Sequence, residues 1–378
     1  MSQFKRILIL SCSHGSGHKM VAASLKEGFE SLGHTVSVKD LFNETNPALN
    51  RFIEKSYLLS YTIGSSFYQR MYYDMEEGAH GKFIYNLWHL TDKTLLGLVD
   101  DFQPDCIINT YPYTISSIMK KDNYPDIPVF SVVTDFCIPK AWMHKDTDGY
   151  YVSCDNVEAS LLAEGFSKSQ ILKTGIPIRE TFYHNENRLR LMKKHGLDPR
   201  KKTLIIFAGT YGILKNMKEV CTRTDSLANL QTIVICGKNR SLQRELNLES
   251  FNNTKIFGYV SDIHEFYSIG DIMVTKPGGI TLSEVVEKKI PVILYNPAPG
   301  QEGENAQWFK QQGAAVVTNT TSELILAIES LKDNEIKRFS MKSNLEKMQY
   351  GHATTLITKD ILYRLNAKNR LAYLNASY

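Results

Sequence analysis

The sequence has no long apolar run, no closely paired cysteines and no large excess of charge of one sign. No stretch reaches the about 18 apolar residues of a membrane-spanning helix, and the polar, basic start has no signal-peptide core. We therefore expect a soluble protein that meets a membrane only from one side. The net charge of +4 predicts no nucleic-acid partner and only a slight preference for anionic surfaces.

Cysteine spacing and acidic motifs argue against two further kinds of site. The six cysteines form no C-x-x-C pair and four lie in or beside apolar runs, so we expect reduced, cytosolic thiols that pack as small hydrophobic side chains. Asp146 and Asp148 have the letters of a metal-binding D-x-D motif, but the Gly149 that follows favours a turn. We assign no metal.

The first half opens with the pattern of a Rossmann-like βα unit. A strand over residues 7–10 and a turn over residues 11–18 precede a helix with one apolar face, formed by Val21, Leu25, Phe29 and Leu32. Met20 stands where a third glycine would complete the dinucleotide fingerprint begun by Gly15 and Gly17. We therefore predict neither a nicotinamide nor a flavin cofactor, and assign no other.

Apolar strands continue to alternate with helical segments along the chain. Further buried strands are predicted at residues 104–109, 129–133, 203–207, 232–236, 255–257, 272–275 and 292–295. At 378 residues the chain fits two ordinary domains, and residues 173–199 have the composition of a hinge. The pattern predicts an α/β protein with two Rossmann-like domains that face each other across a cleft.

The loop after the strand at residues 272–275 is the most informative stretch. Pro277, Gly278 and Gly279 end the strand and allow positive φ or close backbone approach, and the segment from Thr281 to Glu284 reads as a capping box that opens a helix. Backbone N–H groups at a helix start bind anions such as a diphosphate. A second small-residue turn suited to phosphate, which includes Gly209 and Thr210, follows the strand at residues 203–207.

A polar G-Q-E-x-x-N cluster at residues 300–305 follows the strand at residues 292–295. Ligands of open parallel sheets bind at the carboxyl ends of strands, so both polar loops should face one crevice. The segment at residues 276–281, Glu284 and this cluster together resemble the donor-sugar site of the monogalactosyldiacylglycerol synthase family. Its bacterial branch contains the processive diacylglycerol glucosyltransferases. A relative is the lipid-II-forming N-acetylglucosaminyltransferase.

The resemblance covers nearly the whole chain and implies a division of labour. Residues 1–178 would form an acceptor domain with an aromatic insert at 47–93, and residues 179–352 a donor domain of the GT-B type. Residues 353–378 would form a helix that crosses back to brace the first domain.

The resemblance also assigns a role to each donor-site residue. The main chain at Val260 would meet uracil and Glu284 the ribose hydroxyls, although capping the helix is a serious alternative for Glu284. The resemblance assigns the diphosphate to Gly209, Thr210, Arg179 and the helix start at Gly278, Gly279 and Thr281. It assigns the sugar to Gln301, Glu302 and Asn305.

Two residues of the first half are candidate catalytic groups. His18 stands where the family's first loop ends in a histidine, and an imidazole titrates near neutral pH as a general base must. The alternative is a histidine merely exposed in the first helical turn. Asp135, after the strand at residues 129–133, belongs to a Thr-Asp pair also found in the family. It would orient His18 or act as the base itself.

The insert at residues 47–93 is unusually aromatic. It holds ten of the chain's forty aromatic residues: Phe52, Tyr57, Tyr61, Phe67, Tyr68, Tyr72, Tyr73, Phe83, Tyr85 and Trp88. Such side chains suit a membrane interface, where one end is apolar and the other wet. The alternative is a pair of ordinary core helices. The resemblance favours contact with the lipid acceptor, and we assign Phe67, Tyr72, Phe83, Trp88 and Trp142 to the acceptor or membrane surface.

The resemblance implies a UDP-glucose:diacylglycerol glucosyltransferase. It would transfer glucose with inversion, once or in succession, to make β-glucosyl glycolipids for the membrane and the lipoteichoic acid anchor. It would bind as a peripheral protein to the anionic cytoplasmic face of the cell membrane. A UDP-sugar epimerase of the same fold and a non-catalytic nucleotide-sugar sensor are the alternatives, and glucose against galactose, the number of sugars and the oligomeric state stay open.

Overall fold

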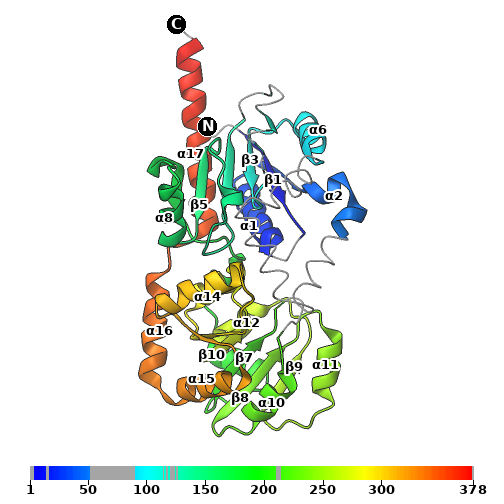
Figure 1. Cartoon of the computed structure of the whole chain (residues 1–378), viewed down its shortest axis with the longest axis vertical. Helices are drawn as coiled ribbons and strands as arrows, with labels where there is room; N and C mark the ends of the chain where they lie inside the picture. The colour runs from blue at the N-terminus through cyan, green and yellow to red at the C-terminus, as the bar shows by residue number, and fades with distance from the viewer. Residues whose placement is uncertain are drawn as a thin grey trace. The chain divides into compact units, whose positions relative to one another are not determined.

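The computed structural model describes residues 4–13, 17–51, 90–113, 115, 118–119, 124, 127–209 and 214–376. The chain forms two compact units, coloured along the sequence in Figure 1. Unit 1 comprises Met1–Arg179 and Tyr350–Tyr378, and unit 2 comprises Glu180–Gln349. Each unit holds a six-stranded parallel sheet with helices packed on it, which confirms the predicted α/β class with two Rossmann-like halves.

The sheet of unit 1 has the strand order β2-β1-β3-β4-β5-β6. Its strands are β1 (Arg6–Ser11), β2 (Thr35–Asp40), β3 (Cys106–Asn109), β4 (Val129–Val132), β5 (Gly149–Val152) and β6 (Ile171–Lys173). Both neighbours of β1 run parallel to it, and Ile7 lies opposite Val36 on one side and Cys106 on the other. The predicted strands at 7–10, 104–109 and 129–133 are confirmed, because these central strands are buried apolar runs.

Helices pack on this sheet, and the apolar core of unit 1 lies between the helices and the sheet. They are α1 (Gly17–Ser31), α2 (Leu41–Thr45), α6 (Asp92–Phe102), α8 (Asp155–Ala163) and α17 (Ala353–Ala376), with short 3-10 turns η1 (Lys140–Trp142) and η2 (Lys168–Gln170). Leu8, Leu10 and Ile107 of the sheet share one apolar cluster with Leu95 and Val99 of α6.

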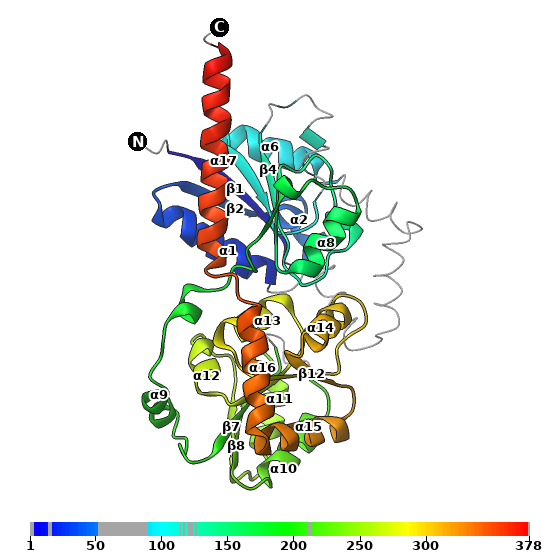
Figure 2. The ribbon, with the colours of Figure 1, turned by 90° about the vertical axis from the view of Figure 1, so that its left-hand side faces the viewer.

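The last helix, α17, belongs to unit 1 although it follows unit 2 in the sequence. It packs against α1 (Figure 2) at Gly28, where an added Cβ would lie 2.5 Å from Cγ2 of Thr354. The Tyr151 hydroxyl donates to Oδ2 of Asp360 at 2.8 Å, and Arg364 Nη2 donates to the carbonyl of Ser169 at 3.1 Å. The chain thus returns from unit 2 to complete unit 1.

The sheet of unit 2 has the order β12-β11-β10-β7-β8-β9. Its strands are β7 (Lys202–Phe207), β8 (Leu230–Ile235), β9 (Thr254–Phe257), β10 (Ile272–Thr275), β11 (Val292–Tyr295) and β12 (Ala315–Thr318). Its helices are α9 (Arg188–Lys194), α10 (Met217–Asp225), α11 (Arg240–Asn247), α12 (Ile263–Ile269), α13 (Gly279–Lys288), α14 (Gln301–Gln311), α15 (Thr321–Asp333) and α16 (Glu335–Lys347), after a 3-10 turn η3 (Glu180–Tyr183).

Each sheet has one point where the strand order reverses. In unit 1 the chain moves outward from β1 to β2 and then in the opposite direction from β3 to β6, so the reversal lies between β1 and β3. In unit 2 it lies between β7 and β10. Ligands of open α/β sheets bind outside the carboxyl ends of strands at such points. Across the described part of the chain, none of the helices has the length and apolarity that a membrane span requires.

Candidate functional site

The reversal point of unit 2 places two glycine-containing turns side by side. Thr275, the last residue of β10, lies opposite Phe207, the last residue of β7. Gly209 follows β7 with φ of +79°, a conformation that favours glycine. Among the described residues, an added Cβ at Gly209 or at Gly278 would meet nothing within 4 Å. Both backbones therefore present an open face that a ligand can approach closely.

The start of α13 differs from the predicted capping box, and that prediction was wrong. The N-cap is Gly278, with φ −74° and ψ 140°, and the helix begins at Gly279, so Thr281 and Glu284 already lie inside it. The N-cap makes no side-chain hydrogen bond, and Gly278 does not take the positive φ that the sequence allowed. The first N–H groups of this helix, which have no partners within it, lie a few residues after β10, where the sequence predicts an anion site.

Glu284 therefore does not cap α13. Its side chain is buried at 2% exposure, and Oε2 accepts a hydrogen bond of 3.0 Å from the Tyr267 hydroxyl on α12. The helix starts early because both glycines take ordinary backbone angles immediately after Pro277. Glu284, the sixth residue of α13, therefore lies in the second turn of the helix rather than beside the N–H groups at its start.

Side chains of α14 hold the β10 loop in place. Asn305, fully buried, donates from Nδ2 to the carbonyl of Pro277 at 3.0 Å. Lys276 Nζ lies 3.6 Å from Oε2 of Glu302, which also accepts from the Ala298 N–H at 2.8 Å. Asn305 therefore supports the turn that follows β10, and its contact with the sugar stays a prediction.

Two other predicted donor residues, Gln301 and Val260, follow strands of unit 2. Gln301 is the first residue of α14, directly after Gly300, which has φ of +87°. Val260 lies after β9, two strands from β7, beside a Tyr259 that is 65% exposed. Arg179 is the last residue of unit 1. Thr210 lies outside the described residues.

In unit 1 the reversal point brings together His18, Thr110 and Thr134. His18 Nδ1 lies 2.6 Å from the carbonyl oxygen of Thr110 and 3.3 Å from the hydroxyl of Thr134. The imidazole also meets the Tyr111 ring edge-on at 5.3 Å. Only a protonated Nδ1 can donate to the carbonyl, so in the neutral ring Nε2 carries the lone pair that a general base needs. His18 is held in one orientation, unlike a merely exposed residue.

Asp135 is the second candidate catalytic group, and it is buried beside the same threonine. The Thr134 hydroxyl lies 3.4 Å from Oδ2 of Asp135, and Ser153 Oγ donates to the Asp135 carbonyl at 2.6 Å. Thr134 therefore lies within hydrogen-bond distance of both predicted catalytic residues. From the sequence Thr134 is recognisable only as part of a Thr-Asp pair, because its partners are distant in the chain.

Most of the residues assigned to the acceptor or membrane surface are not among those that the structure describes. Phe67, Tyr72, Phe83 and Trp88 lie outside the described residues. Trp142, in η1, is 6% exposed, and its assignment to the acceptor or membrane surface stays a prediction.

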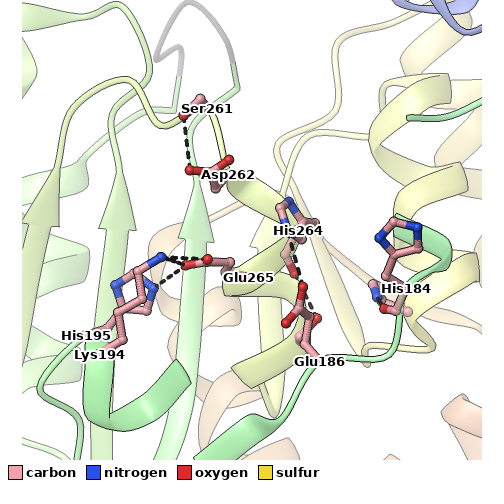
Figure 3. Close-up of polar contacts among 10 residues, drawn as sticks. His184, Glu186, Lys194, His195, Ser261, Asp262, His264 and Glu265 are labelled. Atoms are coloured by element: carbon pink, nitrogen blue, oxygen red, sulfur yellow. Dashed lines mark hydrogen bonds and ion pairs between the residues drawn. The ribbon is translucent and has the colours of Figure 1, made fainter. Parts of the chain in front are cut away.

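The helix that follows the Val260 loop is fixed by charged contacts (Figure 3). Glu265 of α12 accepts from Lys194 Nζ at 2.6 and 2.8 Å and lies 2.9 Å from Nε2 of His195. On the same helix, His264 lies 3.5 Å from Glu186. Burial acts to raise the pKa of Glu265, but the hydrogen bonds from Lys194 and His195 outweigh it and lower that pKa.

Two parallel-sheet units, each with polar groups at its reversal point, are the architecture of GT-B glycosyltransferases. The fold is similar to that of Acinetobacter baumannii MurG (14% identity, TM-score 0.64, 95% of this chain and 99% of that chain). It is also similar to the Staphylococcus aureus MnaA-UDP co-structure (17% identity, TM-score 0.65, 96% and 97%).

Sequence comparison then defines the family. Residues 18–178 match the monogalactosyldiacylglycerol (MGDG) synthase family, and residues 188–348 match glycosyl transferases group 1. The chain is 40% identical to a processive diacylglycerol beta-glucosyltransferase of Bacillus subtilis (strain 168), over 96% of both chains. It is 39% identical to the protein of that name from Bacillus cereus (strain G9842), over 97% of this chain and 95% of the relative. The chain belongs to this glycosyltransferase family.

Neutralising Glu265 tests whether its charge stabilises α12. The lowered pKa means that the stabilisation is present above the unfolded value of about 4.3 and is lost as the pH falls through the folded value. Glu265→Gln should therefore lower the free energy of unfolding near pH 7 by about 1–3 kcal/mol. In thermal denaturation the difference from wild type should persist down to about pH 4 and shrink as the pH falls further.

The matched control is Glu346→Gln, which removes an exposed carboxylate bonded to Lys289 and should hardly change Tm. A Glu265→Gln variant as stable as wild type near neutral pH, or a difference that persists in acid, would contradict the argument.

Proposed function

We propose that the protein transfers glucose from UDP-glucose to the hydroxyl of diacylglycerol, and then in succession to glucosyl-diacylglycerol. The observation that carries the proposal is the 40% identity to a processive diacylglycerol beta-glucosyltransferase over 96% of this chain, because it spans both units rather than one domain. The products would be β-glucosyl glycolipids for the membrane and the lipoteichoic acid anchor.

The donor would bind on unit 2 at the reversal point. The open backbone at Gly209 and Gly278 and the uncapped start of α13 suit a diphosphate, because helix N-termini attract anions. Uracil would meet the main chain at Val260, and the ribose would meet Glu284. A fold shared with a protein described as a UDP co-structure supports a UDP-sugar as the donor.

The sugar would lie near Gln301 at the start of α14. Glu302 and Asn305 would act by fixing Lys276 and Pro277, since their own polar groups are engaged there. Holding the loop backbone in place lowers the cost of arranging it when the donor binds.

The chemical step needs a stabilised leaving diphosphate and an acceptor hydroxyl that loses its proton. The α13 start and Arg179 would stabilise the departing charge. Nε2 of His18 would accept the hydroxyl proton, with Nδ1–H fixed on the Thr110 carbonyl. Asp135 would stabilise the imidazolium through its field or serve as the base instead. Direct attack would invert the α-linked donor to a β-glycoside.

The fold alone does not separate this function from epimerisation. UDP-N-acetylglucosamine 2-epimerase of Neisseria meningitidis bound to UDP-GlcNAc has the same fold, with 14% identity and a TM-score of 0.61. The much higher identity to the glucosyltransferases favours transfer. An epimerase would act without lipid, and a sensor would bind the nucleotide without turnover.

We further propose a peripheral position on the anionic cytoplasmic face of the cell membrane, with the aromatic insert at residues 47–93 in contact with lipid. Its support is compositional: the insert combines apolar ring bodies with polar tips, as interfacial segments do.

Radiolabelled UDP-glucose and vesicles that contain diacylglycerol test the function directly. The label should appear in the lipid extract, and a β-glucosidase but not an α-glucosidase should release it. Vesicles without diacylglycerol are the control and should give no labelled lipid. Conversion of UDP-glucose to another UDP-sugar without vesicles would support the epimerase, and binding without any product would support the sensor.

His18→Ala tests the proposed base. Loss of a general base acts only as the proton leaves, so kcat should fall by about 10²–10⁴-fold while calorimetric UDP affinity stays nearly unchanged. The control is His184→Ala, at a histidine of unit 2 whose side chain is 61% exposed, which should keep wild-type kcat. Near-normal kcat in His18→Ala would remove His18 from catalysis and leave Asp135 as the base.

Replacing two aromatic residues of the insert tests the membrane proposal. Burial of each ring at an interface contributes roughly 1–3 kcal/mol, so Phe83→Ser with Trp88→Ser should weaken vesicle flotation and lipid glycosylation. UDP affinity should not change. Phe339→Ser removes a 72% exposed aromatic of unit 2 and serves as the control. If the double variant unfolds, these residues belong to a core and the interface interpretation is wrong.

A further inference from the structure

The buried hydrogen bond between Tyr267 and Glu284 joins two helices with different predicted partners. Tyr267 lies on α12, which begins three residues after Val260, the residue proposed to meet uracil. Glu284 lies on α13, which begins at Gly279, next to the proposed diphosphate site. Both side chains are 2% exposed, and the hydroxyl lies 3.0 Å from Oε2. In a nucleotide the ribose connects the base to the diphosphate. The bond therefore links the helices on which the two ends of the nucleotide would rest.

The Tyr267 ring is itself held in place. Phe182 of η3, 1% exposed, meets it edge-on with ring centroids 5.1 Å apart and an interplanar angle of 86°. α12 is further fixed by Glu265, through Lys194 and His195, and by the contact of His264 with Glu186 (Figure 3). The hydroxyl of Tyr267 therefore occupies a defined position when it donates to Glu284.

We propose that Tyr267 is a positioning residue that orients the Glu284 carboxylate for the ribose hydroxyls of the donor. This inference rests on the proposed UDP-sugar function. A carboxylate has about four acceptor sites, so a bond from Tyr267 to Oε2 is compatible with further bonds from vicinal hydroxyls. A buried carboxylate also needs donors to offset its desolvation, and a defined donor selects one rotamer.

The position of Tyr267 predicts an effect that depends on the ribose. Removing its hydroxyl leaves the ring and its packing on Phe182 intact but lets the carboxylate take other orientations. A nucleotide that needs the carboxylate should bind more weakly. A nucleotide that lacks the ribose hydroxyls should not respond.

Tyr267→Phe tests this prediction by calorimetry with two nucleotides, UDP and 2′,3′-dideoxyuridine diphosphate. We expect UDP affinity to fall by about 3- to 10-fold, the range for one lost hydrogen bond, with no change for the dideoxy compound. KM for UDP-glucose should rise by the same factor while kcat stays the same, because the ribose is held equally in ground and transition states.

Two further variants separate positioning from general stability. In a Glu284→Ala background, Tyr267→Phe should cause no additional loss of UDP affinity, because the double-mutant cycle then lacks the group being positioned. Tyr363→Phe, at a tyrosine of α17 that is 73% exposed, should match wild type.

Two results overturn the inference while the proposed function stands: unchanged UDP affinity in Tyr267→Phe, or an equal loss for both nucleotides, which would mark a purely structural role. A wild-type protein that binds no UDP and makes no glycolipid would overturn the proposed function and this inference together.

Discussion

The hydrogen bond from the buried Asn305 amide to the Pro277 carbonyl fixes the turn after β10, and the shape of the proposed donor site depends on that turn. It joins the first helix after β11 to the turn after β10, and the nearby contact between Lys276 and Glu302 spans the same two segments. A carbonyl left without a partner there would cost about 1–3 kcal/mol, so the loop has a strong reason to keep this shape. That shape lets α13 begin at Gly279, next to the strand, and leaves the N–H groups at its start available for an anion.

The two units use the reversal of strand order in different ways. In unit 2 the groups at the reversal point are mainly backbone: Gly209, Gly278 and the start of α13. In unit 1 they are side chains, with His18 anchored on a carbonyl at the end of β3. Backbone N–H groups stay protonated and suit a fixed anion, whereas an imidazole can exchange a proton. The difference is consistent with the proposal that unit 2 binds the diphosphate and unit 1 supplies the group for proton transfer.

The fold could be predicted from the sequence where burial alone determines the pattern. β10 and β11 were predicted to the residue, because strands buried on both faces are continuous apolar runs bounded by turn residues. Four strands, β2, β5, β6 and β12, were not predicted. The sequence of β2, TVSVKD, mixes polar and apolar residues, and none of its six residues is fully buried. The predicted capping box was wrong for a related reason. Glu284 has the local spacing of a capping residue, but its carboxylate accepts a hydrogen bond from Tyr267 on another helix. Long-range partners such as Asn305 with Pro277 leave no local signal, so the residues were identified but their roles were not.

The contacts around α12 show why a site residue and its support should be considered together. A carboxylate at 2% exposure is costly unless donors compensate for the water it has lost, and Tyr267 is such a donor. Tyr267 packs on Phe182, which belongs to η3, the short turn that opens unit 2. The helix that carries Tyr267, α12, is held by the contact of Glu265 with Lys194 on α9, the helix that follows η3. Each step fixes one more degree of freedom of the next side chain. The orientation of Glu284 is therefore set by the first segments of unit 2 as much as by the helix that carries it.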